Sequence, residues 1–228
     1  PDGYVDAVDI MIGGDAATAI MMLERNEVDW VLAGAPEAIY FEHSPRLHSW
    51  LVRTPTVGTD FLFMNTEMKP FDNVLVRRAL NYAINKARLV RLAGGFGTVA
   101  NGIVPSAMSW TNDSLPRYDY DPAKARALLQ EAGYTNGIKI TLGYQGDNSV
   151  MAHQAEGIQQ DLQQVGSDAT LRPVNSSAFY VEAMTRHQVQ CGVYGWLQDY
   201  PDPGDFLDVL FNGEHITDTD CNNESFYN

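Results

Sequence analysis

Residues 192–211 read GVYGWLQDYPDPGDFLDVLF, and this stretch decides the fold because an apolar run leads directly into a rigid, acidic turn. Val189–Leu197 carries Val, Tyr and Trp bounded by glycine, which predicts a strand of a mostly buried sheet. Pro201 and Pro203 cannot donate to a sheet and fix their own backbone, so they end the strand in a stiff corner. The crevice beyond such a strand end is where open α/β sheets bind ligands.

Two carboxylates follow the predicted strand. Asp199 lies just past its end, and Asp202 is placed to cap a short helix over Gly204–Leu210. A simpler interpretation is that Trp196 is a core residue beside a capping aspartate, because aromatic side chains near turns usually serve packing. On the residues alone, a binding site and a packed turn both remain open.

The totals describe a globular protein with a strong negative charge. The 228 residues include 15 Lys and Arg against 29 Asp and Glu, a net charge of -14 that argues against nucleic acid or an anionic membrane as partner. No apolar run approaches the roughly 20 residues of a bilayer span, and the first residues lack the features of a signal peptide. The chain starts without Met and stops in a polar loop, so we expect a fragment. Cys191 and Cys221 fit either a disulfide or two thiols.

The first sixty residues predict one β-α-β unit. Val5–Ile12 and Val28–Ala33 are expected to be strands, and Asp15–Arg25 a helix capped by Asp15. Such a unit predicts a parallel strand pair in an α/β sheet. A short helix or loop and two extended segments follow, over Pro36–His43, Leu47–Thr54 and Thr59–Met64.

The rest of the chain predicts a second α/β lobe with its own sheet. Asn73–Leu92 has apolar residues at helical spacing, with Asp72 as the expected cap and glycines after it. A long irregular connection, Thr98–Tyr120, leads to a helix over Asp121–Ala132. Strands then alternate with helices, over Ile138–Tyr144, Ser149–Val165, Ala169–Val174, Ser177–His187 and Val189–Leu197. We place a boundary between the two sheet systems near residues 60–68.

Four segments together resemble a known family. They are GGDAATAIMMLERNEVDWV (13–31), NTEMKPFDNVLVRRALNYAINKARLV (65–90), YDPAKARALLQEAGY (120–134) and GWLQDYPDPGDFL (195–207). In order and spacing they are similar to the signatures of the peptide-type extracellular solute-binding proteins of ABC importers. That family comprises dipeptide- and oligopeptide-binding proteins and relatives that bind nickel chelates, haem or sugars. Each motif alone is weak, but together they are a strong signal, and the resemblance covers almost the whole chain.

The resemblance implies an α/β fold, a type II periplasmic-binding-protein-like lobe with a mixed sheet flanked by helices, plus part of the other lobe. Residues 1–62 would be a partial segment of the first lobe. Residues 66–228 would be the second, C-terminal lobe, truncated before its return to the first. The full protein would be longer and would close its two lobes over the ligand about a hinge near residues 60–66.

The same resemblance implies a ligand site at the strand end. In peptide-binding members the Asp of the GWxxD motif pairs with the ligand's α-ammonium, which assigns that role to Asp199 with Trp196 as an aromatic wall. Backbone at Gly195 and Leu197 would pair with an extended ligand as an added strand. Tyr194 and Asn65 complete the predicted ligand-binding residues.

One departure from a peptide site is the lack of a basic residue at the strand end that could hold a peptide carboxylate. Four residues nearby in sequence are candidates, namely His153, Arg172, Arg186 and His187. Peptide is therefore the leading ligand, and a nickel chelate, haem or an oligosaccharide is the alternative. A sensor module that uses the same fold is a further alternative, because fold does not dictate function.

By resemblance we expect a monomeric, non-enzymatic transport component without cofactor or metal. It would deliver peptide or another small solute to the permease subunits of an ABC transporter in the membrane, without binding nucleic acid. We expect an extracytoplasmic location, in the periplasm or at the cell surface, with lipid anchoring left open.

An enzyme or metal protein is the rival class. Four acids recur every third residue, Asp199, Asp202, Asp205 and Asp208, and could bind Ca²⁺ or supply a carboxylate pair for hydrolysis. However, the run lacks the Gly and terminal Glu of a calcium loop, and capping plus a solvated helix face accounts for most of it. The histidines show no HExxH spacing, and no GxSxG nucleophile motif is present.

Overall fold

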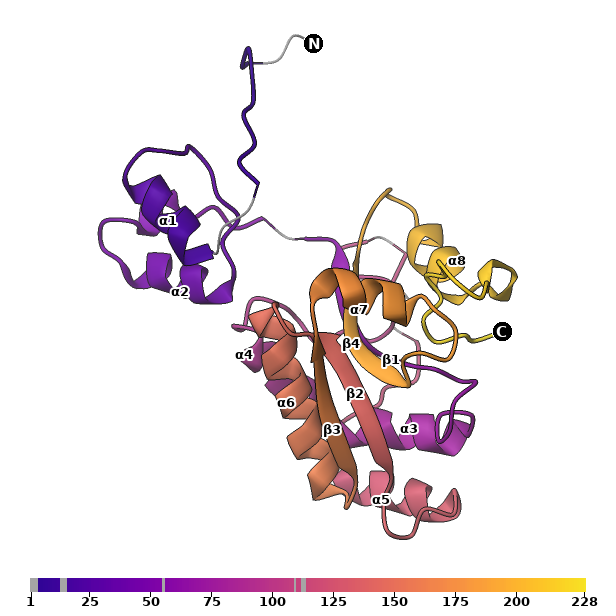
Figure 1. Ribbon diagram of the computed structural model, residues 1–228. Coiled ribbons are helices and arrows are strands. Elements are labelled where there is room, and N and C mark those ends of the chain that lie inside the picture. The colour runs from indigo at the N-terminus through magenta and orange to yellow at the C-terminus, as the bar shows by residue number, and fades with distance from the viewer. Residues whose placement is uncertain (1–3, 13–15, 55, 109, 112–113) are drawn as a thin grey trace. The chain divides into compact units, whose positions relative to one another are not determined.

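The computed structural model describes residues 4–12, 16–54, 56–108, 110–111 and 114–228 (Figure 1). The chain divides into two compact units, Pro1–Arg53 and Thr54–Asn228. The division falls before strand β1 (Gly58–Met64), because β1 pairs along its whole length with a strand of the second unit. The lobe boundary expected at residues 62–66 concerns the longer protein and stays a prediction.

The first unit is helical where it is regular. Helix α1 (Ala16–Glu24) confirms a predicted helix, and α2 (Ala35–His43) shows that the segment expected as a short helix or loop is a helix. Ile20, Phe41 and Leu47 form a small buried cluster. The expected cap Asp15 lies outside the described residues. Leu47–Thr54, expected to be extended, contains a 3-10 turn, η1 (His48–Trp50).

The two strands predicted in the first unit are wrong. Neither Val5–Ile12 nor Val28–Ala33 forms a strand, and Val8 and Trp30 are exposed. A strand needs a neighbour to satisfy its backbone N–H and C=O groups, and the described residues of this unit hold no such neighbour. The predicted β-α-β unit is therefore not formed by these residues.

The second unit is built on a mixed four-stranded sheet, which confirms the predicted fold class. Its strands are β1, β2 (Lys139–Gln145), β3 (Asp168–Val174) and β4 (Cys191–Leu197), in the order β1-β4-β2-β3. β2 is parallel to β3 and β4, whereas β1 is antiparallel to β4. The predicted alternation of three strands and two helices after residue 138 is confirmed.

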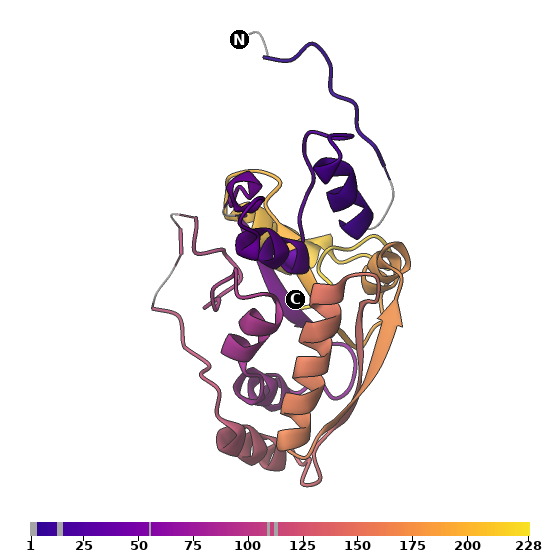
Figure 2. The same ribbon diagram turned by 90° about the vertical axis from the view of Figure 1, so that its left-hand side faces the viewer.

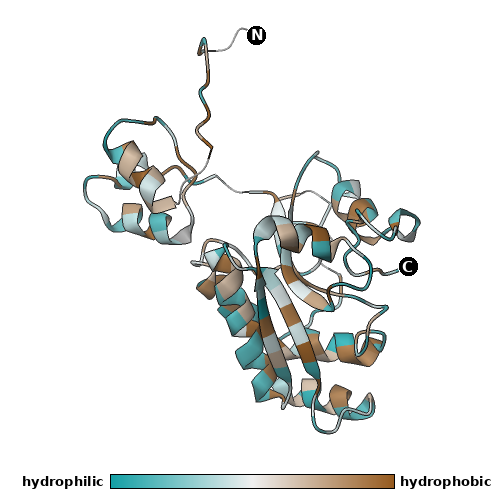
Figure 3. Ribbon diagram, in the orientation of Figure 1, coloured by the Kyte–Doolittle hydropathy of each residue, from teal (hydrophilic) through white to brown (hydrophobic). Residues whose placement is uncertain are grey.

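One face of the sheet carries the larger core. Helices α3 (Val74–Ala83), α5 (Pro122–Glu131) and α6 (Ser149–Gln164) cover it, and α6 runs along the sheet in Figure 2. Buried side chains from these helices meet those of β2 and β4, among them Leu80, Leu129, Leu142, Leu162 and Val193. In Figure 3, brown (hydrophobic) segments alternate with paler or teal ones along the strands and along the helices beside them. Asp121 caps α5 as predicted, since its carboxylate accepts from the Lys124 N–H at 2.9 Å.

The helix predicted over Asn73–Leu92 is two helices, α3 and α4 (Lys86–Leu92). Asn73, not the expected Asp72, caps α3 by accepting from the Leu75 N–H at 2.9 Å. Asn85 caps α4, and its own N–H donates to the Asp161 carboxylate of α6 at 2.8 Å. The helix is interrupted at Asn85 because its side chain caps α4 and its N–H bonds to Asp161, so that this N–H is not used to continue α3.

Helix α7 (Ser176–Ala183) and the C-terminal segment lie on the other face. Phe179 of α7 packs with Phe63, Val189 and Tyr194 in a second buried cluster. The helix predicted to reach His187 ends at Ala183, because the chain turns into β4 with His187 in the left-handed region (φ 65°).

Helix α8 (Gly204–Phe211) follows β4 after the proline turn and is followed by a 3-10 turn, η2 (Gly213–His215). The expected cap is corrected. Pro203 occupies the N-cap position without a side-chain bond, because the proline side chain has no acceptor. Asp202, one residue before the N-cap, accepts a hydrogen bond from the Gly204 N–H at 2.8 Å. Both cysteines are buried thiols, without a disulfide between them.

Candidate functional site

The predicted strand end is an open backbone edge. β1 and β4 are antiparallel, and their hydrogen bonds include Gln198 N–H to Val57 O at 2.8 Å and Asn65 N–H to Gln190 O at 3.0 Å. Because bonded residues alternate along an antiparallel pair, the N–H and C=O groups of Gly195 and Leu197 point away from β1. β2 lies on that side, but it pairs with β4 only at Cys191 and Gly192. The backbone of the last β4 residues is thus paired with β1 but unpaired on the side that faces β2.

Trp196 lies in the last, turn-proximal part of β4, and Asp199 follows the end of this strand by two residues. Trp196 is half-buried, and its Nε1 is buried without a hydrogen-bond partner in the described part of the chain. Asp199 is exposed, two residues beyond β4. Its carboxylate makes no hydrogen bond or ion pair with the residues that the structure describes. An exposed, unpaired carboxylate beside an open strand edge can accept charge-assisted hydrogen bonds from a cation.

Asp205 is a site residue that the sequence pattern did not reveal. It lies in the first turn of α8 and is fully buried, whereas the sequence suggested a solvated helix face. Its Oδ2 accepts from the Asp199 N–H at 2.9 Å, so it holds the backbone of Asp199 directly. Its Oδ1 is buried without a partner among the described residues.

The four carboxylates of the turn share one electrostatic neighbour, the hydroxyl of Tyr200. Desolvation, followed by the charges of Asp205, Asp202, Asp208 and Asp199, raises the pKa of Tyr200. All four acids of the three-residue repeat therefore lie close enough to act on Tyr200. The three-residue repeat noted in the sequence thus places four negative charges near one side chain.

These negative charges have little compensation from their own part of the chain. Residues 187–228 contain eight Asp and Glu and no Lys or Arg. Asp208 has partners in Asn212 (Nδ2 to Oδ1, 2.8 Å) and His215 (Nε2 to Oδ2, 3.8 Å). Within the described residues, no group of three or more His, Cys, Asp or Glu side chains is arranged to hold a metal ion.

Asp60 of β1 and Gln154 of α6 form a further pair of side chains near β4 that the sequence analysis did not predict. Asp60 of β1 lies opposite Gly195, and an added Cβ on Gly195 would come within 2.6 Å of the Asp60 carboxylate. The Gln154 amide of α6 donates to Asp60 at 3.1 Å, and its Oε1 is buried without a partner in the described residues. Only the strand register, which sequence does not give, brings Asp60 to the site.

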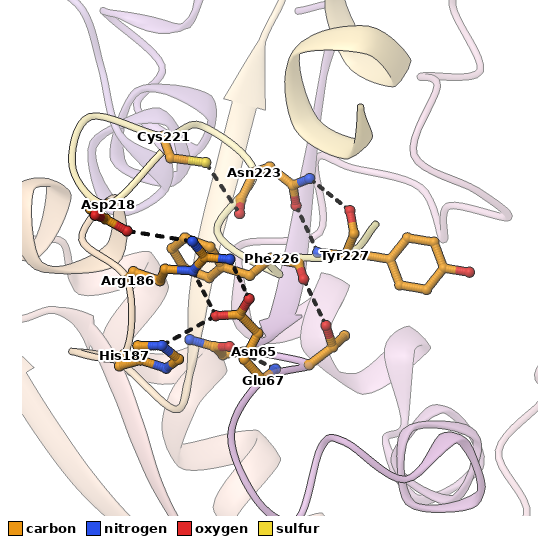
Figure 4. Close-up of polar contacts among 10 residues, drawn as sticks. Asn65, Glu67, Arg186, His187, Asp218, Cys221, Asn223, Phe226 and Tyr227 are labelled. Carbon is orange, nitrogen blue, oxygen red and sulfur yellow. Dashed lines mark hydrogen bonds and ion pairs between the residues drawn. The ribbon is translucent and has the colours of Figure 1, made fainter. Parts of the chain in front are cut away.

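Tyr194 and Asn65 lie apart from the strand-end carboxylates. Tyr194 is buried against Phe61 and Phe179, and burial raises the pKa of its hydroxyl. Asn65 follows the last residue of β1, which lies beside the first residue of β4. Its side chain is buried and donates to Val189 O at 3.4 Å. It also accepts from the Glu67 N–H at 3.0 Å (Figure 4). The length of β4 therefore separates Asn65 from Asp199.

The candidate carboxylate-binding residues are engaged or distant. Arg186 forms two hydrogen bonds with Glu67, at 2.6 and 2.9 Å, before the start of β4, and they hold the pKa of Glu67 below its usual range (Figure 4). His187 lies 3.4 Å from the same carboxylate. Arg172 pairs with Glu182 at 2.8 Å. None of these three residues therefore supplies the basic group that the sequence analysis found to be lacking at the end of β4.

A mixed α/β lobe with an open strand edge beside a proline turn is typical of the two-lobed, type II class of solute-binding proteins. Residues 2–218 match the sequence model of a protein family, the bacterial extracellular solute-binding proteins of family 5 (middle part). The chain belongs to this family. Among the described residues, no helix combines the length and apolar character required to cross a membrane.

Named relatives agree with this assignment. The chain is 36% identical over 182 residues to the glutathione-binding protein GsiB of Escherichia coli K12, covering 78% of this chain and 35% of that protein. It is 35% identical over 183 residues to GsiB of Salmonella typhimurium, with 78% and 36% covered. The periplasmic binding protein DppA of Helicobacter pylori, solved with the peptide STSA, superposes with a TM-score of 0.80 at 27% identity. That match covers 93% of this chain and 41% of DppA. The chain spans just over a third of the length of the curated relatives it matches.

Proposed function

We propose that this chain belongs to a solute-binding protein that captures peptides for an ABC importer. Asp199 receives the peptide's α-ammonium, and the edge of β4 receives its backbone. The observation on which this depends is the exposed carboxylate of Asp199, which has no partner among the described residues. It follows a strand whose last residues are unpaired on the β2 side. The peptide bound to DppA and the family membership support the ligand class.

The proposed binding mode explains broad peptide recognition in physical terms. Backbone pairing at Gly195 and Leu197 does not depend on ligand side chains, and an ammonium–carboxylate bond does not depend on sequence. Trp196 offers an apolar wall at the same place. Delivery to a membrane permease, closure of two lobes about a hinge near residues 60–66, and a location outside the cytoplasm with or without a lipid anchor complete the proposal.

The test is peptide affinity of the full-length gene product, measured by calorimetry. Asp199→Ala removes a charged hydrogen bond and is expected to weaken binding by more than about 1.5 kcal/mol. Glu214→Ala is the matched control, because it removes an exposed acid from the same part of the chain and should leave affinity unchanged. Equal affinities for the wild type and Asp199→Ala would overturn the assignment of Asp199.

A further inference from the structure

The buried carboxylate of Asp205 lacks a counter-charge in the structure. It is fully buried, its Oδ2 accepts from the Asp199 N–H, and its Oδ1 has no partner among the described residues. A buried carboxylate is costly unless it is paired and hydrogen-bonded. Its hydrogen-bond partner is the backbone N–H of Asp199, the residue proposed to receive the ligand's ammonium, so a ligand cation would supply the missing counter-charge.

Neighbouring groups add to the negative charge instead of offsetting it. Asp202 is an exposed acid three residues after Asp199, and among the described residues its carboxylate accepts from the Gly204 N–H alone. From β1, the charged side chain opposite Gly195 is another acid, Asp60. Residues 187–228 offer no Lys or Arg. One ligand ammonium on Asp199 would leave most of this charge uncompensated.

We propose that the end of β4 selects ligands carrying two positive charges at their amino end, namely peptides with an amino-terminal Lys or Arg. The α-ammonium pairs with Asp199, and the side-chain cation lies in the field of Asp205 and Asp202. Asp205 is the specificity-determining residue. Its buried charge attracts the ligand's side-chain cation, but its buried side chain makes no contact that would favour a neutral ligand side chain. This inference rests on the proposed function and narrows its ligand class.

The test compares Lys-Ala-Ala with norleucine-Ala-Ala, which has the same chain length as lysine without the side-chain ammonium. Calorimetry on the full-length gene product is expected to give about tenfold tighter binding of the lysine peptide, the size of one charge-assisted hydrogen bond. Asp205→Asn keeps an acceptor for the Asp199 N–H but loses the charge. It should bring the affinities for the two peptides within about threefold of each other. Glu214→Gln, the control for net charge, should keep the preference.

The outcomes separate the two proposals. Equal affinity of the two peptides for the wild type would overturn the charge selectivity while leaving peptide binding intact. Binding of neither peptide would count against the proposed function itself. If the Asp205→Asn protein does not fold, the wild-type comparison still decides selectivity. A preference that survives Asp205→Asn unchanged would contradict the role of Asp205.

Discussion

Glu224 is the residue in which burial and ionisation conflict most clearly. It is 2% exposed, its Oε1 has no partner among the described residues, and burial raises its pKa to about 8 from an ordinary value of 4.5. The native state therefore keeps a proton that the unfolded state releases above pH 4.5. This contribution to stability is full below pH 4.5 and is lost as the pH rises through about 8.

Replacing Glu224 by Gln should remove this part of the pH dependence. Urea unfolding at pH 5.5 and at pH 8.5 is expected to show a smaller loss of unfolding free energy for Glu224→Gln than for the wild type. The difference should be on the order of a few kcal/mol, because each pKa unit corresponds to about 1.4 kcal/mol. The exposed Glu214→Gln is the control and should behave as the wild type does. Identical losses in all three proteins would contradict the burial argument.

At the residue scale, the sequence placed two of the proposed site residues correctly relative to β4. Asp199 and Trp196 follow from a strand ended by prolines, a pattern contained in one short stretch. The burial of Asp205 could not be predicted, because an aspartate in the first turn of a helix can equally well cap the helix, face solvent or be buried. Asn65 was predicted on its motif alone, and only the antiparallel pairing of β1 with β4 shows that it lies at the opposite end.

At the element scale, two strands depend on glycine for the packing of α7. An added Cβ on Gly192 of β4 would come within 2.6 Å of Phe63 and 2.8 Å of Phe179. An added Cβ on Gly143 of β2 would come within 2.7 Å of Phe179. The rings of the second buried cluster thus lie directly on the sheet backbone, which fixes the distance between α7 and the sheet.

Gly192→Ala is therefore expected to lower the free energy of unfolding by about 1–3 kcal/mol through overpacking. Gly97→Ala is the matched control, because its added Cβ would have nothing within 4 Å. Urea titration of both variants measures the difference. Equal stability of the two variants would mean that the rings move aside without cost, and the packing argument would fail.

The accuracy of the element predictions follows the range of the interactions involved. Helices such as α5 and α6 were predicted because their caps and apolar spacing are local. The break between α3 and α4 was missed because Asp161 acts on Asn85 from another helix. The strands predicted in the first unit were wrong because apolar composition cannot supply a neighbouring strand.

At the scale of the whole molecule, the second unit contains all four strands and both of its buried clusters. Residues 54–228 expressed alone should therefore fold cooperatively, since the backbone bonds of the sheet and the core contacts are retained. Circular dichroism during thermal unfolding should show a single transition, and the 228-residue chain serves as the comparison. A gradual loss of signal without a transition would show that this unit depends on the remainder.

The central claim, a family 5 solute-binding protein that captures peptides at the end of β4, is tested most directly by its natural cargo. The full-length gene product, purified without refolding, would be examined by native mass spectrometry before and after denaturation. We predict a ladder of peptide masses released on denaturation. A single non-peptide mass, such as a metal chelate or a sugar, would keep the fold and contradict the ligand.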